Sequence, residues 1–203
     1  MSVLVLCEYS QRVTAELLRL GIDAYSCDIL PTTGKRPDKH LRCDALDALS
    51  AKKWSGIIAF PPCTRLARSA WPYIHKHGLQ AETRSAVQFF LSIWSYAGLM
   101  KIPCAIENPY PNTLASSLLP PYNQIVQPWQ YGHDEQKSTC LWLYRLPPLL
   151  PVEIGNAKHK RMHNMGQCKA RGLKRSLTYT GIATAMATQW QSFFRANEAQ
   201  SSN

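Results

Sequence analysis

Short apolar runs alternate with amphipathic segments through the first half of the chain. Residues 2–7 form an apolar run typical of a buried strand. The spacing of apolar side chains in residues 11–20 predicts a helix, which Gly21 ends. Residues 22–27 predict a second strand that ends at Asp28. The opening is therefore a strand–helix–strand unit with an acidic residue after its second strand.

The same alternation continues to the C-terminus. Five further short strands are expected, at residues 41–43, 56–60, 103–106, 125–127 and 139–144. The last two are expected to form a hairpin. The expected helices are residues 45–51, 81–99 and 180–195, with residues 64–80 read as a loop. Alternating strands and helices predict an α/β fold with a mostly parallel sheet and helices on both of its faces.

Polar or reactive residues follow five of the predicted strands. Ligands of parallel α/β sheets bind beyond the carboxyl ends of the strands, so these positions are candidates for a binding or catalytic site. They are Glu8, Asp28, Asp44, Cys63 and Glu107.

Length and composition favour one core domain, with at most a small appendage. The chain has 203 residues, 45% of them hydrophobic, and no apolar stretch of about 20 residues that would span a membrane. Residues 1–7 are too short for a signal peptide, so we expect a cytoplasmic protein. Seven cysteines without a CxxC pair favour reduced thiols. The net charge of +10 favours nucleic-acid contact, although many basic proteins only have a basic surface.

Asp28 and Asp44 are candidates for binding an adenosine-containing cofactor. An acid at the end of the second strand can accept hydrogen bonds from ribose hydroxyls, and Asp44 can meet the adenine amino group. A helix cap or a surface acid is the structural alternative for Asp28. The first turn, residues 7–11, contains no glycine. This counts against a dinucleotide, whose pyrophosphate needs close backbone approach, and less against S-adenosylmethionine.

Cys63 and Glu107 are the candidate catalytic pair. Cys63 follows Pro61 and Pro62 at a strand end, and a rigidly held thiol near Arg65 and Arg68 would be nucleophilic. Glu107 follows the strand predicted at residues 103–106. Partial burial at a strand end raises the pKa of a carboxyl group and favours proton donation to a heterocycle. An inert thiol in a structural turn is the alternative for Cys63.

These motifs resemble those of the DNA cytosine-C5 methyltransferase family. Pro61-Pro62-Cys63 and Glu107-Asn108 match the motif pair of that family, residues 131–137 resemble its later Tyr-Gly…Gln segment, and Gly181 resembles its final cofactor motif. The chain is more similar still to short methyltransferase-like proteins encoded by phages and prophages. These share the CEYS, PPCT, ENP, QPWQYGH and GIATAMA segments over nearly the whole length.

The resemblance implies a Rossmann-like core that methylates cytosine in DNA with S-adenosylmethionine. Cys63 would attack C6 of the base and Glu107 would hold its N3 edge, with Pro62 and Asn108 beside them. Residues 64–80 would close over DNA phosphates, and the base would be flipped or unpaired. The implied cofactor-binding residues are Glu8, Tyr9, Ser10, Asp28, Ile29, Asp44, Ala45, Phe60, Pro61 and Gly181. The implied DNA-binding residues are Arg65, Arg68, Lys137, Lys158, Lys160, Arg161, Lys169, Arg171, Lys174 and Arg175.

The chain departs from that family in three ways. The glycine-containing cofactor turn is absent, the arginines expected after Gln136 are replaced by Ser138 and Cys140, and no reader domain is present. The expected organisation is a catalytic core at residues 1–146, a basic Pro-rich loop at 147–179, a helix at 180–196 and a tail at 197–203. We expect short sequence specificity, or help from a partner subunit.

Two further readings stay open at this stage. The same fold could modify a free pyrimidine nucleotide or install another modification on phage DNA, or it could bind DNA without turnover. His159, His163 and Cys168 lack a fourth ligand, so no metal site is predicted.

Overall fold

The computed structural model describes residues 2–152 and 177–200. The basic segment at 153–176 lies outside these residues, and with it Lys158, Lys160, Arg161, Lys169, Arg171, Lys174 and Arg175. Within the described residues no helix is long and apolar enough to cross a membrane.

A single sheet of seven strands forms the centre of the molecule, in the order β3-β2-β1-β4-β5-β7-β6. Its first five members along the order are parallel, and β7 runs antiparallel to both β5 and β6. The strands are β1 (Ser2–Leu6), β2 (Ala24–Cys27), β3 (His40–Leu41), β4 (Trp54–Ala59), β5 (Cys104–Pro109), β6 (Gln124–Val126) and β7 (Thr139–Tyr144). The α/β class, the mostly parallel sheet and the C-terminal hairpin are as predicted, and the topology is compatible with a Rossmann-like fold.

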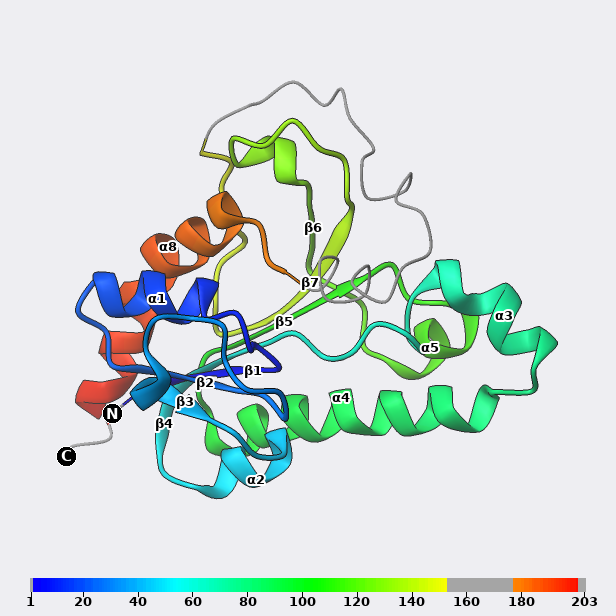
Figure 1. The fold of residues 1–203 in the computed structure, drawn as a ribbon, viewed down its shortest axis with the longest axis horizontal. Coiled ribbons are helices and arrows are strands. Elements are labelled where there is room, and N and C mark those ends of the chain that lie inside the picture. The colour runs from blue at the N-terminus through cyan, green and yellow to red at the C-terminus, as the bar shows by residue number, and fades with distance from the viewer. Residues whose placement is uncertain (1, 153–176, 201–203) are drawn as a thin grey trace.

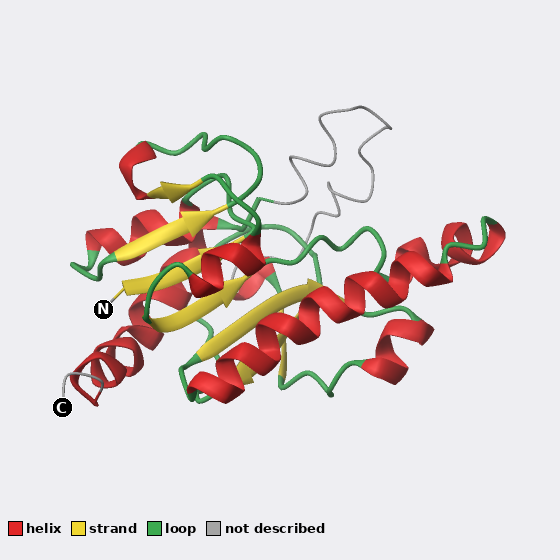
Figure 2. Ribbon diagram, turned by 90° about the horizontal axis from the view of Figure 1, so that it is seen from below, coloured by secondary structure: helices red, strands yellow, loops and turns green. Residues whose placement is uncertain are grey.

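Helices cover both faces of this sheet, as Figures 1 and 2 show. The α-helices are α1 (Arg12–Arg19), α2 (Ala45–Ser50), α3 (Trp71–Lys76), α4 (Gln80–Met100), α5 (Thr113–Leu118) and α8 (Thr180–Gln200). Three short 3-10 helices are η1 (Pro37–Lys39), η2 (Arg68–Ala70) and η3 (Pro128–Gln130). α1 and α8 lie together on one face, and α2 and α4 lie on the other.

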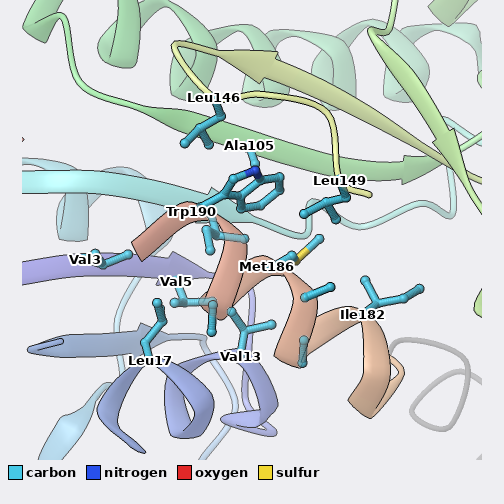
Figure 3. Close-up of a cluster of buried hydrophobic side chains, with 14 of the residues drawn as sticks. Val3, Val5, Val13, Leu17, Ala105, Leu146, Leu149, Ile182, Met186 and Trp190 are labelled. Atoms are coloured by element: carbon cyan, nitrogen blue, oxygen red, sulfur yellow. The ribbon is translucent and has the colours of Figure 1, made fainter. Parts of the chain in front are cut away.

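Alternation along β1 divides the core into two layers. Val3 and Val5 pack with the side of α1 and α8, where Trp190 is fully buried (Figure 3). Leu4 and Leu6 face the opposite layer with α2 and α4. All four of these β1 side chains have no exposed surface, because successive residues of a strand point to opposite faces and both faces are covered.

Three local predictions from the sequence were wrong. Residues 64–80 contain η2 and α3 in place of a continuous loop, because Pro72 fits the first turn of α3 and Ile74 is fully buried beneath it. α5 was not expected at all. α8 continues to Gln200, past the expected end at 196, and Asn197 in its last turns is buried.

Candidate active site

The candidate residues lie where the strand order of the sheet reverses. From β1 the chain continues to β2 and β3 on one side, and β4 and β5 lie on the other. Such a reversal is where ligands of open α/β sheets bind, outside the carboxyl ends of the strands. Because β1 to β5 are parallel, the residues that follow β1, β2, β3, β4 and β5 all lie at this one edge of the sheet.

A buried side chain joins the Pro-Pro-Cys segment to the Glu-Asn-Pro segment. Ala59 of β4 pairs with Ile106 of β5, so the Pro-Pro-Cys segment leaves the sheet beside the Glu-Asn-Pro end of β5, which stays paired with β7. The Asn108 side chain is almost fully buried, and its Nδ2 donates a hydrogen bond of 2.8 Å to the carbonyl oxygen of Pro61. Asn108 therefore fixes the backbone that precedes Cys63 relative to the strand that carries Glu107.

Further hydrogen bonds continue this contact beyond the motifs. The backbone N–H of Arg68 donates to the Tyr110 carbonyl at 2.7 Å, and that of Asn112 donates to the Leu66 carbonyl at 2.7 Å. The fully buried Asn112 side chain also donates to the Arg65 carbonyl at 2.8 Å. The segments 61–68 and 108–112 thus form one paired unit, which we call the paired loops.

Asn112 was not identified from the sequence. Its side-chain oxygen accepts from the N–H of Ala115 at 2.9 Å, which makes it the N-cap of α5. An asparagine followed by Thr113 and Leu114 was a possible cap signal in the sequence. Its second role, in holding the Arg65 backbone, depends on the separate chain segment that passes beside it.

The turn that contains Cys63 is tight. The Cys63 carbonyl accepts hydrogen bonds from the N–H groups of Leu66 at 3.1 Å and Ala67 at 2.9 Å. Pro61 is buried, Pro62 is exposed and Cys63 itself is half-buried. Because prolines lack an N–H and have a fixed φ, the approach to Cys63 leaves no donor unsatisfied and little conformational freedom.

Glu107 lies in an environment that favours its neutral form. Burial raises the pKa of its carboxyl group, while the positive charge of Lys137 and a hydrogen bond from Thr139 lower that pKa in part. The net shift is upward, which is the direction needed for a carboxyl group that donates a proton near neutral pH.

Lys137 is thus placed beside the candidate acid. Its backbone N–H donates to Oε1 of Gln127 at 3.0 Å, and its Nζ lies 5.8 Å from the ring centre of Tyr179. The sequence predicted Lys137 only as a DNA-binding cation. The structure adds an electrostatic influence on Glu107, from a residue 30 positions further along the chain.

The ends of β2 and β3 supply acidic and apolar groups. One carboxylate oxygen of Asp28 accepts from the N–H of Leu30 at 2.9 Å, and no described residue donates to its other oxygen. The neighbouring Ile29 side chain is 70% exposed. Asp44 caps α2 by accepting from the N–H of Leu46 at 2.8 Å. Burial raises the pKa of nearby Cys7, and the charges of Asp28 and Asp44 raise that pKa further. Asp44 is therefore a helix cap at the candidate edge.

Glu8 faces α1 and not the open edge of the sheet. Its two carboxylate oxygens accept from the N–H groups of Val13 (2.6 Å) and Thr14 (3.2 Å) and from the Thr14 hydroxyl (2.6 Å). The group is 3% exposed, and burial raises its pKa to about 7 against the lowering effect of these bonds. The expected direct contact between this carboxylate and a cofactor does not fit this orientation, because its hydrogen-bonding capacity is used by the helix.

The glycine-free first turn is also covered by a later segment. The Tyr9 carbonyl accepts from Thr33 N–H at 3.0 Å and from the Thr32 hydroxyl at 2.8 Å. The buried Gln11 side chain bonds both backbone groups of Arg36, at 2.7 and 3.1 Å. Tyr9 and Ser10, the predicted cofactor contacts of this turn, are half-buried.

Gly181 has a packing role that its position explains. A Cβ atom there would lie 1.9 Å from the carbonyl oxygen of Tyr131, so only glycine allows α8 to approach the Tyr131-Gly132 segment. Its N–H donates to Nε2 of His133 at 3.0 Å. The glycine was predicted to contact a cofactor, but its close neighbours are these protein groups.

The remaining predicted residues divide by exposure. Ala45 is buried, Phe60 and Arg65 are half-buried, and Arg68 is exposed with its guanidinium 5.7 Å from the ring centre of Tyr110. Among the residues that the structure describes, no three His, Cys, Asp or Glu side chains are grouped to hold a metal ion. His159, His163 and Cys168 lie outside those residues.

No protein-family model matches the chain, and no curated protein sequence matches it significantly.

Proposed function

We propose that the chain is a DNA cytosine-C5 methyltransferase in which Cys63 is the nucleophile and Glu107 the acid. The observation that carries this proposal is the pairing of the two motif segments. The 2.8 Å bond from Asn108 to the Pro61 carbonyl ties a half-buried cysteine to the strand of a carboxyl group whose pKa is raised. A structural turn with an inert thiol does not require a half-buried carboxyl group with a raised pKa on the neighbouring strand.

The proposed reaction follows from these two groups. The Cys63 thiolate forms a bond to C6 of cytosine, while the protonated Glu107 gives its proton to N3, which takes up the electron pair displaced from the ring. C5 becomes nucleophilic and takes the methyl group of S-adenosylmethionine, whose sulfur would leave as a neutral thioether. Solvent water then removes the C5 proton, N3 returns its proton to Glu107, the electrons form the C5–C6 double bond, and Cys63 leaves as thiolate. Asn108 acts as a positioning residue for the Cys63 backbone.

The residues at the ends of β2 and β3 fit the adenosine half of S-adenosylmethionine. The open oxygen of Asp28 suits ribose hydroxyls, the exposed Ile29 side chain suits the face of an adenine ring, and Asp44 suits its amino group. When bound, this cofactor would supply the methyl group. Asp28 and Ile29 bind and orient in this proposal, and the buried Glu8 supports the turn from behind.

A polymeric substrate is supported by the charge of the chain. Lysines and arginines number 23 against 13 acids, whereas a free nucleotide needs few cations. Cytosine C6 is inaccessible inside a duplex, so the base must be flipped or already unpaired when it reaches Cys63.

DNA binding without turnover is the second candidate. It is favoured by the first turn, where Glu8 is turned to α1 and Tyr9 is covered by Thr32 and Thr33. Closure of this turn leaves less room for the methionine part of the cofactor.

The test is transfer of a labelled methyl group from S-adenosylmethionine to cytosine-containing DNA and, separately, to deoxycytidine monophosphate. We expect 5-methylcytosine in digests of the DNA, and none with Cys63→Ala. Cys43→Ala is the matched control, because Cys43 is also half-buried at the same edge and is expected to retain transfer. Full transfer by Cys63→Ala would exclude the covalent route, and DNA binding without any transfer would favour the second candidate.

A further inference from the structure

α3 presents aromatic side chains to solvent directly after the candidate nucleophile. It begins at Trp71, eight residues after Cys63, and lies beyond the amino-terminal end of α4 (Figure 1). Tyr73 is 57% exposed, and among the described residues its ring contacts only that of His77, on the turn that ends the same helix. Only Ile74 of this helix is buried.

The rings on this helix are arranged in two pairs. Tyr73 and His77 have ring centres 4.3 Å apart with planes inclined by 39°, and Trp71 and His75 have ring centres 6.1 Å apart. The i,i+4 spacing brings each pair together on the helix surface. The Tyr73 ring thus packs against His77 on one side, with much of its surface still open.

Positive charge accompanies these rings without any opposing acid in the same segment. Arg68 and Lys76 are exposed, as are His75 and His77, and no Asp or Glu occurs in residues 61–81. We define the α3 surface as the side chains of Arg68, Trp71, Tyr73, His75, Lys76 and His77. Cations between exposed rings are the combination with which proteins bind unpaired nucleic acid strands.

The α3 surface is connected to the candidate site through Arg68. Its N–H donates to the Tyr110 carbonyl, and its guanidinium lies 5.7 Å from the Tyr110 ring centre, three residues after Glu107. Arg68 is therefore held by the paired loops on one side and begins η2, which leads into α3, on the other. Arg68 is thus a cation that lies between the candidate site and α3 along the chain.

We propose that the α3 surface binds single-stranded DNA, with Tyr73 stacking on an unpaired base and Arg68 and Lys76 contacting the phosphates next to it. A duplex offers ring faces only at its ends, since its bases are already stacked on one another, so an exposed tyrosine favours the unpaired strand. This inference rests on the proposed function, because it names single-stranded DNA as the substrate class of the proposed methyltransferase. The binding itself requires no methyl transfer.

The test is fluorescence anisotropy with the full chain and a labelled cytosine-containing oligonucleotide, single-stranded or annealed to its complement. We expect tighter binding of the single strand, weakened about tenfold by Tyr73→Ala and preserved by Tyr73→Phe, because one stacked base is worth roughly 1–3 kcal/mol. Lys76→Ala should reduce the slope of log K against log salt by about 0.7, the value for one phosphate on a single strand. Lys53→Ala is the matched control, an exposed lysine at the amino-terminal end of β4 that should change neither quantity.

Two outcomes would overturn the inference: equal affinity of Tyr73→Ala and the unchanged chain for the single strand, or preferential binding of duplex that Tyr73→Ala does not alter. Each is separable from failure of the proposed function. Tyr73-dependent binding without methyl transfer would support DNA binding by the α3 surface and contradict the proposed methyltransferase activity. Methyl transfer to DNA, together with single-strand affinity that Tyr73→Ala does not alter, would support the enzyme and exclude binding by the α3 surface.

Discussion

The side-chain amide of Asn108 donates a 2.8 Å hydrogen bond to the carbonyl oxygen of Pro61, across the boundary between β5 and the end of β4. The bond is buried, so water cannot replace it without opening the site. It makes the position of Cys63 depend on the strand that carries Glu107. The chemistry proposed for those two residues therefore depends on a contact between two motifs 44 residues apart.

Asn112 provides a way to separate positioning from stability. Asn112→Asp keeps an acceptor for the N–H of Ala115, so it preserves the cap of α5, but it cannot donate to the Arg65 carbonyl. We expect the free energy of unfolding to fall by about 1–3 kcal/mol and turnover at saturating substrate to fall more than tenfold, with little change in KM. Chemical denaturation and steady-state methyl transfer measure the two effects.

Asn123→Ala is the control for this variant. Asn123 accepts from the N–H of Leu143 at 2.7 Å and donates its own N–H to the Leu141 carbonyl at 2.8 Å, so its hydrogen bonds go to β7. It should lose comparable stability while the folded enzyme keeps its turnover. Equal loss of turnover in both variants would show that Asn112 has only a structural role.

Lys137 should set the upper pH limit of activity. Its positive charge lowers the pKa of Glu107, so Lys137→Met should raise that pKa further. Because Glu107 is proposed to act in its protonated form, the fall in turnover at high pH should move to higher pH in Lys137→Met and stay in place in Lys137→Arg. The measurement is the pH profile of turnover at saturating DNA. An unchanged pH profile in Lys137→Met would show that the fall in turnover at high pH does not report the ionisation of Glu107.

Glu8 should make stability depend on pH in the acidic range. Burial raises the pKa of its carboxyl group from 4.5 to about 7, so the folded state binds the proton more tightly than the unfolded state does. The contribution is then fully present below pH 4.5 and is lost as the pH rises through about 7, by roughly 3 kcal/mol. Glu8→Gln cannot ionise, so its stability curve over this interval should be flatter. Identical curves would mean that Glu8 is already ionised in the folded protein.

Gly181 and Gly98 should respond in opposite directions to the same substitution. In Gly181→Ala the new methyl group would lie 1.9 Å from the Tyr131 carbonyl oxygen, so α8 or the Tyr131 segment must move. We expect a loss of several kcal/mol, in the range of other overpacked sites. Gly98→Ala in α4 meets nothing within 4 Å and should gain about 0.5–1 kcal/mol from helix propensity. Thermal denaturation of both variants provides the comparison.

The fold class was predictable because the strands of this sheet are buried on both faces. β1 and β4 contain the apolar runs VLVL and GIIA, which the sequence shows directly, and Pro61 and Pro62 stop the second run. α3 was not predictable in the same way. Its single buried side chain, Ile74, gives no periodic pattern, and Pro72 near its start is also typical of a loop.

The site was predictable to the level of motifs and not of orientations. Parallel strands place Asp28, Cys63 and Glu107 at one edge of the sheet whatever the loops do. Where a carboxylate points depends on which unsatisfied N–H groups are nearest. Glu8 was expected at that edge but turns to the N-terminus of α1, which has no side-chain cap of its own at Gln11.

The most direct test of the account is a covalent adduct between Cys63 and C6 of a cytosine. An oligonucleotide with fluorine in place of the C5 hydrogen blocks the final proton loss, so the enzyme incubated with it and S-adenosylmethionine should be trapped. We predict one oligonucleotide per chain by mass spectrometry of the intact protein, mapped to the peptide containing Cys63 and absent in Cys63→Ala. Methyl transfer to ordinary DNA without any such adduct, or an adduct on a different cysteine, would contradict the assignment of Cys63 as the nucleophile.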